Sequence, residues 1–149
     1  MKIREFDRDF AEEIVQRLKV LPADRRPNWG KMRATDLVPH LTQTMLYSMG
    51  RRGKKPFEGN WVTRRLVAPL VLNGWVPMLK NVQLVPAAAP DSTGYTLETL
   101  QAVLQDYLSE VETGAMRPEP HPLFGDIGVD GWARMHSRHF DHHFKQFDL

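Results

Sequence analysis

Apolar side chains recur every three or four residues in several stretches of this chain, which is the spacing of an amphipathic helix. The first predicted helix covers residues 6–21, with Asp7 or Asp9 as its N-cap and Pro22 just beyond its end. Its apolar face is formed by Phe10, Ile14, Leu18 and Leu21. The breaker-rich stretch that follows, PADRRPNWG, predicts a loop.

A second helix is predicted over residues 35–49, where Leu37 and Leu41 lie on one face. Thr35 is its predicted N-cap because a threonine hydroxyl can accept an otherwise unpaired backbone N–H. Pro39 fits this helix only near the first turn, where backbone N–H groups have no partner within the helix.

Two further helices are predicted in the second half of the chain. Residues 96–113 carry a continuous apolar stripe and are followed by Gly114, a typical helix-ending glycine. Residues 130–147 form the last helix, with its cap near Gly128 or Asp130. The intervening segment 51–95 is irregular, with one short helix predicted in WVTRRLVAPLVL.

These elements predict an all-α fold, a four-helix bundle formed by a single domain over residues 1–149. The long irregular crossover between the second and third main helices permits parallel neighbours in place of a simple up-down-up-down order.

The amino-acid composition excludes several classes of function. The chain has no cysteine, which excludes disulfides, thiolate metal ligands and a cysteine nucleophile. Its net charge of +2 gives no argument for a nucleic-acid partner. The basic residues of the irregular segment are predicted to form a solvated loop, with nucleic-acid binding as the alternative: Arg51, Arg52, Lys54, Lys55, Arg64 and Arg65. No apolar run reaches the ~18 residues of a membrane span, and the charged start MKIREFDRDF lacks a secretory apolar core, so we expect a cytoplasmic protein with no membrane partner.

Five of the six histidines follow residue 120, and four of them lie within 136–143. At about 100° per residue, His136, His139 and His143 fall on the side of the last helix opposite its charged residues. Asp141 falls on the charged side and is therefore no candidate for a general base. An inward-facing histidine must find partners for both ring nitrogens, so three of them point to a function.

The spacing of His139 and His143 places two imidazoles one helical turn apart, as in helical H-x-x-x-H metal sites. His40 lies close to the apolar stripe of the second helix and is the predicted third ligand. Three neutral imidazoles suit Zn²⁺, Ni²⁺ or Fe²⁺ and leave a coordination position for water or substrate. His121 is predicted to be structural or on the surface, and His136 and His142 to be supporting partners or ordinary helix positions.

The motifs PNWGKMRATDLVPHL, HPLFG and W-x-x-x-H-x-x-HFDHHFKQF together resemble the DinB/YfiT-like superfamily, and the similarity extends through LVAPLVLNGWVPMLKN. The closer similarity is to an uncharacterised branch of bacterial proteins of about this length. The resemblance implies a four-helix bundle with a divalent metal on three histidines at the positions of His40, His139 and His143, in a final pattern like H-x-x-H-H-x-x-Q that ends at Gln146. Characterised relatives are metal-dependent thiol transferases and isomerases, and many are homodimers.

Two functions follow. The first is a metal-dependent transferase or hydrolase acting on a small molecule, with a low-molecular-weight thiol or water as nucleophile; its catalytic residues are not identified. The second is a non-catalytic metal- or ligand-binding bundle, in which the metal ties two helices together.

Tyr47 and Gln43 flank His40 and are candidates to line a pocket, with burial in the core favoured for Tyr47. Packing is likewise the favoured role of Trp29 and Trp132.

Overall fold

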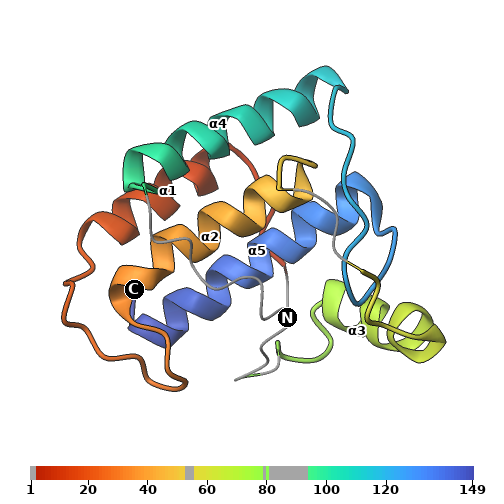
Figure 1. Ribbon diagram of the computed structural model, residues 1–149, viewed down its shortest axis with the longest axis horizontal. Coiled ribbons are helices and arrows are strands. Elements are labelled where there is room, and N and C mark those ends of the chain that lie inside the picture. The colour runs from red at the N-terminus through yellow and green to blue at the C-terminus, as the bar shows by residue number, and fades with distance from the viewer. Residues whose placement is uncertain (1–2, 53–55, 79, 81–93) are drawn as a thin grey trace.

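The computed structural model describes residues 3–52, 56–78, 80 and 94–149 (Figure 1). Within those residues it contains five α-helices and one π-helical turn: α1 Arg8–Lys19, α2 Ala34–Ser48, η1 Thr63–Val67, α3 Ala68–Leu72, α4 Leu97–Thr113 and α5 Gly128–Phe147. The same residues include no β-strand, only an isolated bridge between His121 and Gly125. The predicted all-α class is therefore confirmed.

The helices α1, α2, α4 and α5 lie alongside one another, and η1 and α3 lie at one end of them (Figure 1). Arg8 at the start of α1 pairs with Glu112 near the end of α4, so these two helices are antiparallel. Arg51, just after α2, pairs with Asp106 and Glu110 in the second half of α4, so α2 and α4 run in parallel. The long connection between α2 and α4 allows this parallel arrangement.

The helices α2 and α5, which carry the candidate ligands, are antiparallel neighbours. His40 in the first half of α2 contacts His139 in the second half of α5, while Ser48 at the end of α2 contacts His136. These two contacts determine which residues of α2 and α5 face each other between His40 and Ser48.

One main apolar core joins α1, α2, α4 and α5. Its most deeply buried side chains come from all four helices: Ile14, Leu37, Leu41, Met45, Leu100, Leu104, Tyr107, Phe140 and Phe147. A second, smaller cluster joins α3 to the first half of α5 through Ala68, Val71, Trp132 and Met135. Arg138 donates to the Val71 carbonyl and Arg134 to the Asn73 side chain, so α5 also holds the end of α3 by hydrogen bonds.

The sequence located α1 and α4 well. The carboxylate of Asp7 accepts the backbone N–H of Phe10 at 2.8 Å, so Asp7 is the N-cap of α1. Thr96 caps α4, and Gly114 ends it with φ of 73°, a conformation that costs glycine little. The last helix, α5, begins two residues earlier than predicted, at Gly128.

The predicted start of α2 is wrong. The N-cap is Arg33, and Thr35 already lies inside the helix. The Asp36 carboxylate accepts the backbone N–H of Arg33 and also pairs with its guanidinium, so the helix start is held by Asp36 and not by Thr35. Pro39 consequently lies beyond the first turn, where its missing N–H leaves the Thr35 carbonyl without its usual partner within the helix.

The irregular segment is described in part. The short helix expected in WVTRRLVAPLVL is present as η1 and α3. Lys54 and Lys55 of the basic stretch lie outside the described residues. No helix of the described part is both long and apolar enough to cross a bilayer.

Candidate metal centre

Three histidines from α2 and α5 converge at one point, and we call His40, His139 and His143 the three-histidine cluster. The Nε2 atom of His139 lies 3.0 Å from Nε2 of His40 and 3.0 Å from Nε2 of His143. One nitrogen from each of the three rings lies within 4.8 Å of the other two. The structure thus brings together all three residues that the sequence proposed as ligands.

The local geometry of the helices explains this convergence. His139 and His143 lie one turn apart on α5, so their rings project from the same side of the helix, with centroids 4.6 Å apart. The antiparallel α2 brings the His40 ring to 4.9 Å from each of them. His143 is buried, and His40 and His139 are partly buried, so the cluster lies at the edge of the core.

Gln146 fixes the protonation pattern of His143. The amide nitrogen of Gln146 donates to the Trp29 carbonyl at 2.9 Å, so its amide oxygen faces the His143 ring. That oxygen lies 2.7 Å from Nδ1 of His143 and accepts its proton. In the neutral ring, the lone pair is then on Nε2, which is the atom that points into the three-histidine cluster.

Two of the three rings, those of His139 and His143, are held in their neutral, metal-binding form. Burial is the main cause that lowers the pKa of His143 to about 3, and the nearby His40 lowers it further. Burial also holds the pKa of His139 well below its ordinary value, with His143 and His40 as additional causes. Neutral imidazole is the form that binds a metal, so no proton has to be displaced from these two rings at neutral pH.

The donor set and its spacing fit a divalent metal. With metal–nitrogen bonds of about 2.0–2.1 Å, two ligand nitrogens lie about 3.4 Å apart at a tetrahedral angle and about 2.9 Å apart at a right angle. The two 3.0 Å separations fall in this range. A single proton on His139 can bridge to only one of its two neighbours, whereas a cation interacts favourably with all three nitrogens. Three histidines close together could therefore bind a metal ion.

His142 lies beside the cluster without joining it. Its ring packs edge-on against Trp29, with centroids 5.4 Å apart, and lies 5.2 Å from the ring of His143. The ammonium group of Lys80 lies 4.2 Å from the centre of the Trp29 ring. Burial, and then the charge of Lys80, lower the pKa of His142.

The other two histidines have structural contacts. His121 is buried, and its Nδ1 accepts backbone N–H groups from Leu123 and Phe124 at 3.1 and 3.2 Å, so its predicted structural role is confirmed and its surface alternative is wrong. His136 is completely buried, with its Nε2 2.8 Å from the hydroxyl of Ser48.

The remaining candidates belong to the core or the surface. Tyr47 is buried, its hydroxyl donates to the Pro120 carbonyl, and its ring packs on Trp132, so the core interpretation is confirmed. Gln43 is buried as well. Asp141 is exposed in an ion pair with Lys145, as its position on the charged face predicted.

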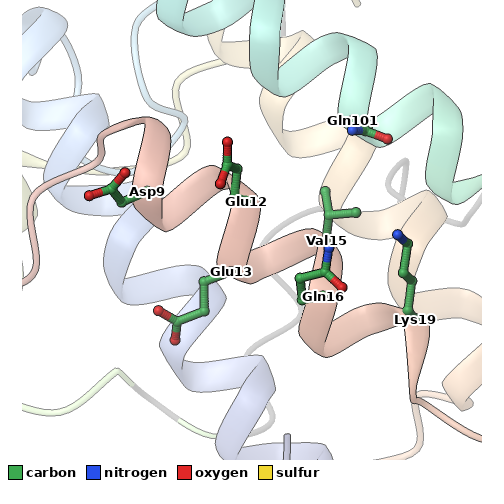
Figure 2. A pocket seen from close by; sticks show the side chains of 7 residues that line it. All are labelled: Asp9, Glu12, Glu13, Val15, Gln16, Lys19 and Gln101. Carbon is green, nitrogen blue, oxygen red and sulfur yellow. The ribbon is translucent and has the colours of Figure 1, made fainter.

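Two surface hollows lie away from the cluster. Figure 2 shows one between α1 and α4, and its lining is mainly acidic and polar: Asp9, Glu12, Glu13, Val15, Gln16, Lys19 and Gln101. The other is lined by Phe57, Asn60, Trp61, Arg64 and Arg65. Neither lining contains a histidine, so neither hollow is an approach to the cluster.

Sequence reasoning missed the part played by Trp29. Its backbone carbonyl orients Gln146, and its ring lies against His142, so this loop residue supports the cluster in two ways. The pattern of residues gave no signal for this, because both contacts join residues far apart in the sequence, 117 positions in the case of Trp29 and Gln146.

The described structure is thus a helical protein with a cluster of three histidines that could hold a divalent metal. The chain belongs to a family of proteins of unknown function, DUF1569, whose model matches residues 2–148. No curated protein and no solved structure matches the chain.

Proposed function

We propose that this chain is a metal-dependent enzyme that binds its ion through His40, His139 and His143, and that it acts as a transferase or hydrolase on a small molecule. The observation that carries this proposal is the convergence of three Nε2 atoms from two helices. The described residues offer no other histidine or carboxylate in that group. A three-ligand site leaves room for a substrate or water, which is the pattern of catalytic metal sites.

The residues of the chain supply binding and orientation. Gln146 holds His143 in the tautomer that presents its lone pair, and burial keeps His139 and His143 neutral. A bound Zn²⁺, Ni²⁺ or Fe²⁺ would supply Lewis-acid chemistry that lowers the pKa of a water or thiol. Since the chain has no cysteine, any thiol must come from a separate molecule, and a low-molecular-weight thiol is the proposed co-substrate.

The resemblance to the DinB/YfiT-like superfamily supports the same proposal. Helix α1 is antiparallel to α4, and α2 is antiparallel to α5, which is compatible with a four-helix bundle of that kind. With the superfamily resemblance we also propose a cytoplasmic location, a homodimeric state and no nucleic-acid partner.

One observation favours the alternative, a non-catalytic bundle in which the metal serves stability. His143 is buried, and the three histidines come from two different helices, α2 and α5. A metal held by them would tie α2 to α5.

The first experiment is elemental analysis of protein purified without a histidine tag. We expect about one divalent metal per chain in the unmodified protein, and loss of that metal in His40→Ala and His143→Ala. His121→Ala is the control, because His121 lies outside the cluster, and circular dichroism verifies that each variant is folded. Equal metal content in His143→Ala and His121→Ala would refute the assignment.

Activity then separates the two functions. Metal-loaded protein is assayed for transfer of a low-molecular-weight thiol to electrophiles and for hydrolysis of esters and amides. Turnover by the metal-loaded protein that is absent from His40→Ala and from every other variant that has lost the metal would support the enzyme. A protein that binds metal, gains thermal stability from it and turns over no substrate would support the structural alternative.

A further inference from the structure

The exposed apolar residues of this protein are gathered on one segment. Of the described large apolar side chains that are exposed, all but Val20 lie within residues 57–75. We call them the α3 face: Phe57, Trp61, Val62, Leu66, Leu70 and Trp75. Trp61 and Trp75 are 67% and 70% exposed, although tryptophan is usually largely buried.

The α3 face is the outer side of a short amphipathic segment. Val62, Leu66 and Leu70 are spaced four residues apart along η1 and α3 and are exposed, whereas Ala68 and Val71 point inward to the smaller core cluster. The backbone N–H of Trp75 donates to the Leu70 carbonyl at 2.9 Å, so Trp75 lies beside the end of this stripe. Figure 1 shows the segment at one end of the molecule, apart from α1 and α4.

The size of the α3 face exceeds what a monomer usually leaves uncovered. An aromatic side chain has about 150–250 Å² of surface, so the exposed parts of its three aromatic rings alone amount to on the order of 400 Å². The aliphatic stripe adds to this area. Apolar patches larger than a few hundred Å² mark sites that contact a protein or a membrane.

The charge around the α3 face is positive. Among the described residues of 56–80, Arg64, Arg65 and Lys80 are basic and Glu58 alone is acidic, whereas the chain as a whole has a net charge of only +2. Arg64 and Arg65 belong to the segment itself, and Arg134 and Arg138 of α5 hold its end. Among the residues that the structure describes, none of these four arginines forms an ion pair, while Arg8, Arg33 and Arg51 all do.

We propose that the α3 face binds the surface of an anionic lipid bilayer. Tryptophan prefers the interface between water and lipid, and a short amphipathic segment with arginines at its edge binds there by apolar insertion and by attraction to anionic headgroups. Each basic residue near such a surface strengthens binding about fivefold. The segment does not span the bilayer. The sequence predicted no membrane partner because it has no apolar run long enough to span a bilayer. The exposed α3 face leads us instead to propose binding at the bilayer surface.

Two other occupants fit the same face less well. A two-fold contact with a second copy would bring Arg64 and Arg65 of both chains together, where like charges repel. A single-stranded nucleic acid could stack on Trp61 and Phe57, but it has no group that matches the aliphatic stripe of Val62, Leu66 and Leu70.

The test is co-sedimentation with vesicles. We expect the full chain to bind vesicles in which about a third of the lipid is phosphatidylglycerol, to ignore vesicles of phosphatidylcholine alone, and to release at high salt. Tryptophan fluorescence should shift to the blue on binding, because Trp61 and Trp75 are the more exposed of the four tryptophans. This result depends on no metal and is independent of the function proposed above.

Matched variants locate the contact. The double variant Leu66→Glu and Leu70→Glu should weaken binding at least tenfold, and Arg65→Glu at least fivefold. Val20→Glu and Arg26→Glu change an exposed apolar and an exposed basic residue elsewhere, and should bind as the unmodified protein does. Circular dichroism verifies the fold of each.

Several results would overturn the proposal. They are absence of vesicle binding, equal binding to neutral and anionic vesicles, and equal loss in the Val20→Glu control. A homodimer that Leu66→Glu and Leu70→Glu dissociate without lipid would assign the face to a second copy. Binding of an oligonucleotide in place of vesicles, lost in Arg65→Glu, would assign it to nucleic acid.

Discussion

At the scale of single residues, the hydrogen bonds of buried polar groups determine which chemistry is possible. The Gln146 amide is held between the Trp29 carbonyl and Nδ1 of His143, at 2.9 and 2.7 Å. Groups of this kind, one contact away from a metal ligand, set its tautomer and orientation, and their loss typically costs 10–100-fold in metal affinity.

Gln146→Leu removes this acceptor while keeping a side chain of similar size. We expect roughly 10–100-fold weaker binding of Zn²⁺, measured by competition with a chromophoric chelator. In the metal-free protein, ¹⁵N chemical shifts of His143 should change from the pure Nδ1–H tautomer to a mixture. Gln101→Leu, on the exposed side of α4, is the control. An unchanged tautomer in Gln146→Leu would contradict the role of Gln146 even if the protein binds no metal.

The contacts of His121 predict a loss of stability in acid. Its Nδ1 accepts two backbone N–H groups, and burial lowers its pKa to about 4. Between pH 6.5 and about 4 the unfolded chain takes up a proton that the folded protein does not, so stability falls as the pH falls through this range. At about 1.4 kcal/mol for each pKa unit, this group contributes on the order of 2 kcal/mol of that loss by pH 5.

Urea unfolding at pH 7.5 and pH 5 measures the effect. His121→Asn keeps a side-chain acceptor without the titration, so the variant should lose less stability than the unmodified protein between the two pH values. Equal losses of stability in the variant and the unmodified protein between pH 7.5 and pH 5 would show that His121 is not buried in its neutral form. His136 is buried as well, with a pKa lowered to about 3, so part of the acid loss should remain in the variant.

The sequence predicted the three-histidine cluster but not its surroundings. The i, i+4 spacing of His139 and His143 and the inward position of His40 are properties of single helices, which periodicity reveals. The contact between Gln146 and Trp29 depends on where the loop after α1 lies, and so does the packing of Trp29 on His142. Those positions come from the tertiary structure, which no local pattern encodes.

At the scale of elements, the segment before η1 is held by a close backbone contact. Gly59 lies so near the Leu123 carbonyl that a Cβ atom there would be 2.1 Å from its oxygen. The N–H of Glu58 donates to the Pro122 carbonyl at 2.8 Å, which joins the two loops at this point. Only glycine allows this approach.

Gly59→Ala should therefore displace this loop. We expect destabilisation of about 1–3 kcal/mol, which for a chain of this length lowers the melting temperature by several degrees, measured by calorimetry. Glu58→Ala changes an exposed neighbour and should melt within about a degree of the unmodified protein. Equal melting temperatures for all three proteins would show that the two loops do not approach as described.

Helix boundaries were predicted best where the cap is a local feature. Asp7, Thr96 and Gly114 stand at the ends of α1 and α4, and each acts through neighbours in the sequence. The start of α2 was misassigned because Thr35 fits the capping pattern, whereas the cap in the structure is made by Asp36 returning to Arg33. A carboxylate at the third helical position accepts the backbone N–H of the N-cap residue, so a helix can be capped without a hydroxyl at the N-cap.

At the scale of the whole molecule, the arrangement of helices explains how distant residues meet. The long connection lets α2 and α4 run in parallel, and α5 returns antiparallel to α2 with its histidines opposite His40. The sequence predicted the helical class from periodicity. It did not reveal the α3 face, because Pro69 interrupts that segment. Its inner and outer sides become distinct only when α3 packs on α5.

If the cluster binds metal in the folded state alone, metal should stabilise the entire protein. We expect Zn²⁺ in 100-fold excess over its dissociation constant to add about 3 kcal/mol and to raise the melting temperature by several degrees. His139→Ala should abolish this shift, and Arg26→Glu, on the exposed loop after α1, should retain it. A shift of the same size in His139→Ala would mean that the ion binds elsewhere.

The contact between His40 and His139 joins positions 99 residues apart. An ion held there would close a loop of that length, and in the chain-entropy description a covalent bridge across such a loop is worth about 5 kcal/mol. In a chain without cysteine, it would be a cross-link that is opened by chelators and is indifferent to reductants. Resistance of the protein to unfolding and proteolysis would then follow the supply of free metal in its compartment.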